Sequence, residues 1–339
     1  MSSTPDGPVP GDGRVGLDVG LDIGGTGLHV VVRRADGAVC ARAQAPTPAR
    51  EGGAAVLSAA TDLVEGVVRS TGGHLRALGV GAAGVVEQGS GLVLAASDSF
   101  VDWVGVAIAD ELSGRLGAPV VVDNDANAFL AGEASAGAVA GLRDVAGITL
   151  GTGVGGALLL GGALHLGAGG AAGEIGHTPG FGDEPCTCGQ RGHLESLAGG
   201  RAVARRYAAR TGRTLPPSAI AEAARGGDQA AAAVWEDAGQ ALGHAGVVLT
   251  TLLDVAAVVV GGGLAGAWDL LEPAAARRVA ASPPVSGRRV DLRRSALGAD
   301  AVAVGAASLA AGLAHGSDPQ QPGPVVVRDG GVGGGAPAA

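Results

Sequence analysis

Four residues within a short stretch carry side chains that bind transition metals, namely His177, Cys186, Cys188 and His193. Two thiolates and two imidazoles form a ligand set that suits tetrahedral Zn²⁺. The spacing differs from that of a zinc finger, so two buried thiols beside a chance pair of histidines stay the alternative. Because the set leaves no open coordination position, it predicts a structural Zn²⁺ rather than a catalytic one.

Two carboxylates, Glu174 and Glu195, flank this cluster. Together with an imidazole, they can accept hydrogen bonds from vicinal hydroxyls of a sugar. Their alternative role is to orient the metal ligands through hydrogen bonds.

A run of polar residues, Asp123-Asn124-Asp125-Ala126-Asn127, follows the hydrophobic stretch Val120–Val122. Sites in α/β folds lie at the carboxyl ends of strands. Asp125 can there accept a proton from a sugar hydroxyl that attacks the γ-phosphate of a nucleotide. A cluster that caps the following helix is an equally good interpretation, since Asp and Asn are preferred caps.

Three glycine turns end hydrophobic stretches, and glycine there lets backbone amides point at an anion such as phosphate. A tight hairpin is the alternative for any single turn. Asp22, directly before the first turn, can hold Mg²⁺ directly or through water, or it can cap the turn. The candidate nucleotide-binding residues are Asp22, Gly24, Gly25, Thr26 and Gly27, then Gly151, Thr152 and Gly153, and finally Gly261, Gly262 and Gly263.

The second turn also fits the dinucleotide fingerprint GxGxxG, at Gly151, Gly153 and Gly156. That fingerprint requires a helix directly after the loop. Residues 154–160 are instead strand-like, which makes a nicotinamide oxidoreductase a weak alternative.

Composition excludes several classes of enzyme. The 339 residues contain no lysine, so all 23 basic residues are arginine. A GxxxxGK[ST] phosphate loop, a protein-kinase strand lysine and a pyridoxal Schiff base all require lysine.

Charge and hydropathy limit the partners and the location. The net charge of −9 argues against nucleic acid as the main partner, and no apolar stretch is long enough to span a membrane. With no visible signal peptide and three cysteines that make a poor disulfide framework, we expect a soluble cytoplasmic protein.

Alternating strands and helices between about residue 14 and residue 315 predict an α/β fold. The unit strand–glycine turn–strand occurs at 15–34 and again at 145–160, which fits two domains with the same hairpin start. Residues 1–13 and 316–339 are expected to form a disordered lead and tail. Further strands are expected at 38–44, 76–81, 119–123 and 256–260, and helices at 54–70, 104–116, within 198–254 and at 302–313.

Several short blocks, in order, give the chain a resemblance to the ROK family of bacterial sugar kinases and sugar-responsive repressors. The resemblance covers about 15–313. The blocks are LDIGGTG (21–27), GVGAAGVVE (79–87), VVVDNDANAFLAGE (120–133), ITLGTGVGG (148–156), GEIGHT (173–178), CTCGQRGHLE (186–195), VVVGGG (258–263) and ALGADAVAVGAASLA (296–310).

The resemblance implies the actin-like ATPase fold of hexokinase type, which is ribonuclease H-like, with two lobes and ATP in the cleft between them. It also implies a homodimer or homotetramer. The small lobe would comprise 14–124 plus about 302–315, and the large lobe, with the zinc loop, 125–301. The implied substrates are a hexose and ATP with Mg²⁺, glucose being the first choice. Kinases for N-acetylmannosamine, N-acetylglucosamine, fructose or allose stay open.

The resemblance also assigns roles by matching position. Asp125 is similar to the family's general base, and the turns at 24–27 and 151–153 to its phosphate loops, with Gly261–Gly263 contacting adenosine. The implied sugar contacts are Asp98, Asn124, Asp125, Glu174, His177 and Glu195, with His177 also a zinc ligand.

The chain departs from the family pattern at three positions. His193 stands where a third cysteine is usual, Gly27 where a basic residue commonly follows the first turn, and Asp98 where a sugar-contacting asparagine is expected. A sugar-responsive repressor would carry an added helix-turn-helix domain, for which about fourteen residues before the first strand are too few. A non-catalytic sugar-binding protein is the other alternative, which the retained Asp125 and the three turns disfavour.

Overall fold

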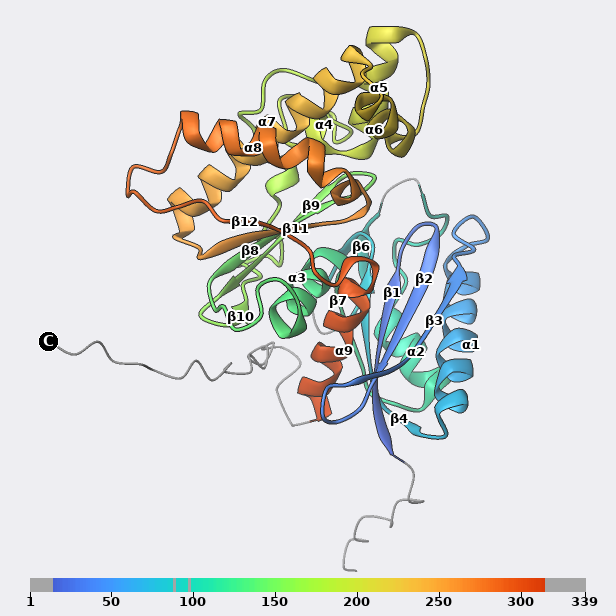
Figure 1. Ribbon diagram of the computed structural model, residues 1–339. Helices are drawn as coiled ribbons and strands as arrows, with labels where there is room; N and C mark the ends of the chain where they lie inside the picture. Colours follow the sequence, from blue (N-terminus) through green and yellow to red (C-terminus); the bar gives the residue numbers. More distant parts are fainter. Residues whose placement is uncertain (1–14, 88–89, 97–98, 315–339) are drawn as a thin grey trace, which may run out of the picture.

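The computed structural model describes residues 15–87, 90–96 and 99–314. In this part of the chain, two separate five-stranded sheets each form the centre of one lobe (Figure 1). The fold is the actin-like ATPase fold. The expected lead and tail, and Asp98, lie outside the described residues.

The first sheet has the strand order β3-β2-β1-β4-β7. Strands β1, β2 and β3 form an antiparallel meander, and β4 and β7 then add in parallel on the other side of β1. The strands are β1 (Gly16–Ile23), β2 (Gly27–Arg33), β3 (Val39–Pro46), β4 (His74–Ala82) and β7 (Val120–Asn124).

The second sheet repeats this plan, with the order β10-β9-β8-β11-β12. An antiparallel hairpin again begins the unit, and two parallel strands again follow. The strands are β8 (Val145–Leu150), β9 (Val154–Leu160), β10 (Ala163–Leu164), β11 (Ala257–Gly261) and β12 (Leu292–Arg294). The glycine turns 24–27 and 151–153 therefore connect equivalent strands, as the sequence repeat predicts.

Two helices, α1 (Gly53–Thr71) and α2 (Ile108–Leu116), cover one face of the first sheet. In α1, Val56, Leu57, Ala60 and Val64 recur at helical spacing and are buried in the core. Gly72 ends this helix in the left-handed conformation, which glycine adopts without a steric penalty.

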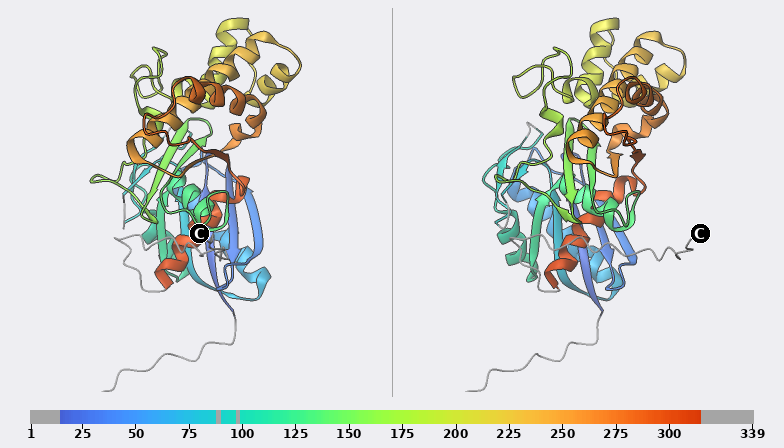
Figure 2. Two further views of the ribbon diagram at one scale, coloured as in Figure 1. Left: turned by 60° about the vertical axis from the view of Figure 1, so that its left-hand side comes forward. Right: turned by 90° about the vertical axis from the view of Figure 1, so that its left-hand side faces the viewer.

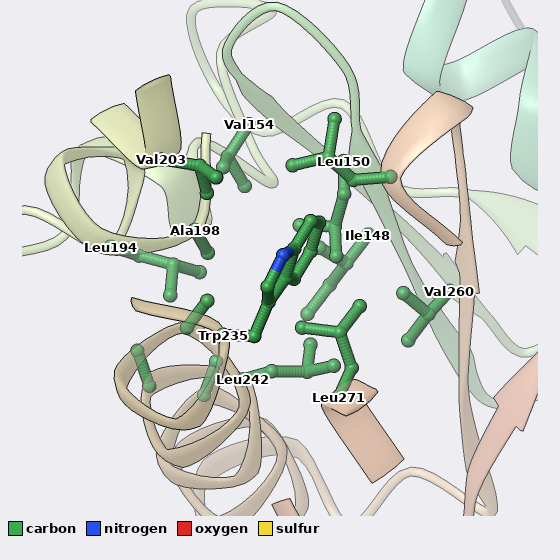
Figure 3. Packing of buried hydrophobic residues seen from close by; sticks show 14 of the residues in the cluster. Ile148, Leu150, Val154, Leu194, Ala198, Val203, Trp235, Leu242, Val260 and Leu271 are labelled. Atoms are coloured by element: carbon green, nitrogen blue, oxygen red, sulfur yellow. The ribbon is translucent and has the colours of Figure 1, made fainter. Parts of the chain in front are cut away.

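Five helices lie beside the second sheet, where the longest of them contacts β11 and the other four pack against that helix. The longest helix, α7, brings Trp235 into the core, where the indole lies among aliphatic side chains of β8 and β11 (Figure 3). The helices are α4 (Glu195–Ala198), α5 (Gly200–Thr211), α6 (Pro217–Arg225), α7 (Gln229–Leu253) and α8 (Trp268–Ala281).

Two further helices, α3 (Asp125–Ala136) and α9 (Ala301–Ala314), cross each other between the sheets (Figures 1 and 2). Helix α9 packs on β1 and β4, whereas α3 contacts strands of both sheets. The crossing is very close, because a Cβ atom at Gly305 would lie 1.7 Å from the carbonyl oxygen of Ala128. The last helix thus returns to the first sheet and supports the helix that begins with Asp125.

The remaining elements are short. They are β5 (Val85–Val86), β6 (Val93–Ala95) and the 3₁₀ helices η1 (Ile175–His177), η2 (Gly263–Ala267) and η3 (Gly298–Asp300). The sequence does not predict β5, β6, β10 or β12, which are at most three residues long. The helix expected at 104–116 begins only at Ile108, since Gly105 has a φ of 89°.

No helix among the described residues is both long and apolar enough to cross a membrane.

Candidate functional site

Asp125 is the first residue of α3, where the chain leaves β7 at the edge of the first sheet. The preceding residue, Asn124, caps the helix, because its Oδ1 accepts a hydrogen bond of 2.8 Å from the backbone N–H of Ala126. Its Nδ2 donates to the carbonyl oxygen of Gly84 at 2.7 Å. Asn124 is therefore the capping residue, and the Ala126 N–H is shared with Oδ1 of Asp125, which it approaches to 2.9 Å.

The Asp125 carboxyl keeps a small exposed surface but lies deep among protein atoms. Burial raises its pKa to about 6, and the charge of Glu174 adds to this effect. Hydrogen bonds from the backbone, chiefly from Ala126, partly offset the increase. Because Glu174 follows β10 and Asp125 follows β7, residues from both sheets converge at this point. A carboxylate with a pKa near neutrality is suited to accept a proton.

Asp22 lies one residue before the end of β1. Burial raises its pKa to about 7, and the charge of Asp125 contributes. In the described part of the chain, neither Asp22, Asp125 nor Glu174 forms an ion pair with an arginine. Carboxylates that lie together without a compensating cation suit a divalent ion such as Mg²⁺, which prefers oxygen ligands. The donor set at Asp22 thus fits the predicted metal.

The first glycine turn is closed by a hydrogen bond of 3.1 Å from the Gly24 N–H to the Gly27 carbonyl oxygen. Thr47, just beyond β3, braces the turn from outside, because its Oγ1 donates to the Gly24 carbonyl oxygen at 2.7 Å. The turn is therefore held in a fixed shape beside Asp22.

The second turn has the same closure, with the Gly151 N–H donating to the Gly153 carbonyl oxygen at 3.0 Å. A Cβ atom at Gly153 would lie 2.2 Å from Oε2 of Glu195, so a larger residue there would displace the Glu195 carboxylate. The strand β9 follows this turn directly, and no helix does, so the dinucleotide interpretation of GxGxxG is wrong.

The third turn borders a pocket of about 370 Å³. Gly262 has a φ of 83° and approaches the Leu150 backbone, so the turn abuts the end of β8. Residues of α6, including Ser218 and Arg225, form the opposite wall together with Trp235. Sequence reasoning finds the glycines but misses this wall, because α6 is far away in the chain and carries no recognisable motif.

The four predicted metal ligands lie together. One ligand atom from each of His177, Cys186, Cys188 and His193 falls within 4.8 Å of all the others. Cys186 Sγ lies 3.7 Å from His177 Nδ1, and Cys188 Sγ lies 3.3 Å from His193 Nδ1. Tetrahedral Zn²⁺ with ordinary bond lengths separates sulfur and nitrogen ligands by about 3.6 Å. The geometry therefore fits the predicted ion.

Glu195 connects this cluster to the second glycine turn. Its Oε2 accepts a hydrogen bond of 3.0 Å from the Val154 N–H, and its Oε1 accepts one of 2.5 Å from Thr187 Oγ1. Sequence reasoning overlooks Thr187, although its place between the two cysteines could have pointed to it. The loop that carries the metal ligands and the turn beside β9 are thus joined through a single carboxylate.

Known proteins support the resemblance. The ROK family matches residues 18–312. The chain is 35% identical over 276 residues to a glucokinase of Streptomyces coelicolor, covering 76% of this chain and 85% of the relative. It is 32% identical over 298 residues to an N-acetylmannosamine kinase of Escherichia coli, covering 86% of this chain and 97% of the relative.

A solved structure of a ROK family glucokinase from Streptomyces griseus, in complex with glucose and AMPPNP, superposes with a TM-score of 0.76. Its sequence is 32% identical, and the match covers 87% of this chain and 99% of the glucokinase. The sequence match over 18–312 and this agreement in fold lead to one conclusion: the chain is a member of the ROK family.

Proposed function

We propose that this protein is an ATP-dependent hexose kinase that transfers the γ-phosphate of ATP to the primary 6-hydroxyl of its sugar. Glucose is the first choice of substrate, since both a curated relative and a solved relative are glucokinases. N-acetylmannosamine is the strongest alternative, because a kinase for that sugar is similar over most of this chain. N-acetylglucosamine, fructose and allose are further alternatives.

The observation that carries the proposal is the Asp125 carboxyl. It lies at the start of α3, its pKa is raised to about 6 by burial and by the charge of Glu174, and its own charge raises the pKa of Asp22. The ionised carboxylate takes the proton of the 6-hydroxyl while the sugar oxygen bonds to the γ-phosphorus and the bond from that phosphorus to ADP breaks. A positioned base of this kind contributes roughly a hundredfold or more to the rate.

The other residues position the two substrates. The turns at 24–27 and 151–153 would bind phosphate oxygens through backbone amides, and Asp22 would hold Mg²⁺. Gly261–Gly263 would contact adenosine, with its adenine ring in the pocket beside α6. The proposed sugar contacts are Asn124, Glu174, His177 and Glu195, with Asp98 outside the described residues. Nδ2 of Asn124 donates one N–H to the Gly84 carbonyl oxygen, so its second N–H is available to a sugar oxygen.

Zn²⁺ at His177, Cys186, Cys188 and His193 is part of the proposal. The ion would supply a fixed shape for the loop from His177 to Glu195, which begins and ends with a proposed sugar contact. The spacing of the four ligand atoms supports it.

The proposed lobes follow the two sheets, with residues 14–124 and about 302–315 in the small lobe and 125–301 in the large one. Packing of α9 on β1 and β4 supports this division. A homodimer or homotetramer is proposed from the family resemblance, and light scattering of the purified protein tests it.

The test of the function is ADP release from ATP and Mg²⁺ across a panel of the five sugars named above plus mannose. Turnover with one of them establishes the activity and identifies its substrate. Asp125→Asn is expected to abolish turnover while sugar binding survives, because the base is lost and the shape is kept. Asp62→Asn, an exposed carboxylate on α1, is the matched control. Silence of the folded wild-type protein across the panel would favour a non-catalytic sugar-binding protein.

A further inference from the structure

A pocket of about 450 Å³ lies on the large lobe, away from the residues assigned above. One wall is the loop segment 180–184, which lies between the proposed metal ligands His177 and Cys186. The other walls are contributed by α5, α7 and α8, through Arg206, Gln240, His244 and Arg278. The aromatic ring of Phe181 meets the His244 ring edge to face, with 5.1 Å between ring centroids, and so joins the loop to α7.

The carboxylates that line this pocket already face arginines. Asp183 pairs with Arg191 at 2.9 Å, and Glu184 lies 4.0 Å from Arg205. Asp237 accepts from two arginines at once, Arg206 and, at 3.0 Å, Arg210. Four arginines therefore lie against the three carboxylates, and Arg278 is not one of them. Every carboxylate of the lining is thus engaged by an arginine, although only Arg206 and Arg278 of these five arginines belong to the lining itself.

Arg278 has no carboxylate partner among the described residues. The contact that the structure records for its guanidinium is with Nδ1 of His244, at 3.1 Å. Because a guanidinium only donates, that nitrogen must accept, and the imidazole must be neutral. Burial lowers the pKa of His244, and the charge of Arg278 adds to the effect, in agreement with a neutral ring. The positive charge of Arg278 therefore has no negative partner.

Arg206 adds a second group with an unmet hydrogen-bonding donor. Its side chain is only 8% exposed, and its Nη2 bonds to Asp237. Its Nη1 is buried and has no hydrogen-bond partner in the described part of the chain. An unsatisfied donor on a buried charged group destabilises a protein, and an anion bound at Arg206 would supply the missing acceptor.

We propose that this pocket is a binding site for a small anionic molecule, whose phosphate or carboxylate group is held by Arg278 and Arg206. Planar guanidinium groups bind both kinds of oxyanion through paired hydrogen bonds. Gln240 and the backbone of the 180–184 segment are available to contact the rest of the molecule. The volume accommodates more than a bare ion, so the ligand is an anionic metabolite rather than free phosphate alone.

The position of the pocket would allow a bound anion to regulate sugar binding, and this regulatory role rests on the proposed function. The same loop carries His177 on one side of the pocket segment and Cys186 on the other. A ligand that joins the 180–184 segment to α7 and α8 would restrict that loop and so change its affinity for sugar. Any such coupling is reciprocal, so sugar would change the affinity for the anion by the same factor.

The test measures binding to the full-length protein by titration calorimetry, with inorganic phosphate, a hexose 6-phosphate and citrate as separate probes. Wild-type protein is expected to bind at least one probe at millimolar concentrations, and Arg278→Gln is expected to weaken that binding about tenfold or more. Arg277→Gln is the matched control, because Arg277 is the adjacent arginine on α8 but pairs with Glu236, outside the pocket. Preference for phosphate esters or for citrate identifies the anionic group.

The His244 ring provides a second measurement, since its NMR resonance, assigned with His244→Gln, is expected to shift on titration with the bound probe. No binding of any probe, or equal binding by wild type and Arg278→Gln, would overturn the proposal. Anion binding to the glycine turns does not confuse the result, because Arg278 does not line them. Neither measurement needs turnover, so a protein without kinase activity can still possess this site.

Discussion

Asp22 at the end of β1 and Asp125 at the start of α3 lie close enough that the charge of Asp125 raises the pKa of Asp22. The two residues come from different elements of the first sheet, about a hundred positions apart in the chain. Two neighbouring carboxylates disfavour each other's ionised form. A bound cation, or a proton held on one of the two carboxyls, removes this repulsion. The predictions below begin from this pair.

The rate of phosphoryl transfer should fall in acid. Asp125 must be ionised to accept a proton, and its pKa is about 6 in the protein without ligands. We expect kcat/KM to drop by about tenfold for each pH unit below that value and to level off above it. A pH profile at constant ionic strength measures this. A rate that stays constant from about pH 7 down to about pH 5 would exclude Asp125 as the base.

Asp22→Asn should stabilise the protein when no Mg²⁺ or nucleotide is present. The folded-state pKa of Asp22 is raised to about 7, so between roughly pH 4 and that value the folded state binds more protons than the unfolded state. The stability contribution is fully present below this window and is lost as pH rises through it. At pH 8 the substitution should raise the free energy of unfolding by about 1 kcal/mol or more.

Thermal unfolding with and without Mg²⁺ measures that effect. Mg²⁺ should stabilise the wild type but not Asp22→Asn, and Asp62→Asn should behave as the wild type does. An Asp22→Asn protein that is less stable than the wild type at pH 8 would mean that the carboxylate has a structural partner instead.

Cys186→Ser should release the metal and loosen the loop from His177 to Glu195. A closed zinc site contributes to folding free energy, so the loss should lower both stability and sugar affinity. Cys40→Ser is the matched control, because Cys40 lies in β3 and only donates to the Val32 carbonyl oxygen. His193→Cys should retain the metal. Elemental analysis gives the zinc content of each variant, and wild-type protein without zinc would refute the site.

Gly305→Ala should destabilise the whole fold. The new methyl group would lie 1.7 Å from the Ala128 carbonyl oxygen, so α9 must move away from α3, and we expect a loss of about 3 kcal/mol or more. Gly312→Ala, on the same helix but with nothing within 4 Å of the added atom, should be neutral or stabilising by up to about 1 kcal/mol. Chemical denaturation compares the two. Equal stabilities would show that α9 is not a fixed support of α3.

Much of the fold follows from local sequence signals. The hairpins at 15–34 and 145–160, helix α1 and the run of helices over 198–254 are predicted because apolar residues recur at strand or helix spacing and glycines mark the turns. The short strands β10 and β12 are not predicted, because two or three residues carry no period and gain their partners only from the neighbouring strand. The start of α2 is wrong by four residues, since a left-handed glycine interrupts the apolar pattern.

The chemical groups of this protein can be identified from the order of its residues: four metal-binding side chains in one stretch, a polar run after a strand, three glycine turns, and no lysine. Local spacing is enough for these, because each motif is contiguous in the chain. That Asp22, Asp125 and Glu174 share one environment, and that Glu195 bonds to both Val154 and Thr187, follows only from the folded chain. Those relationships depend on how two sheets and a helix crossing bring distant segments together, and burial then sets the pKa values that no local pattern encodes.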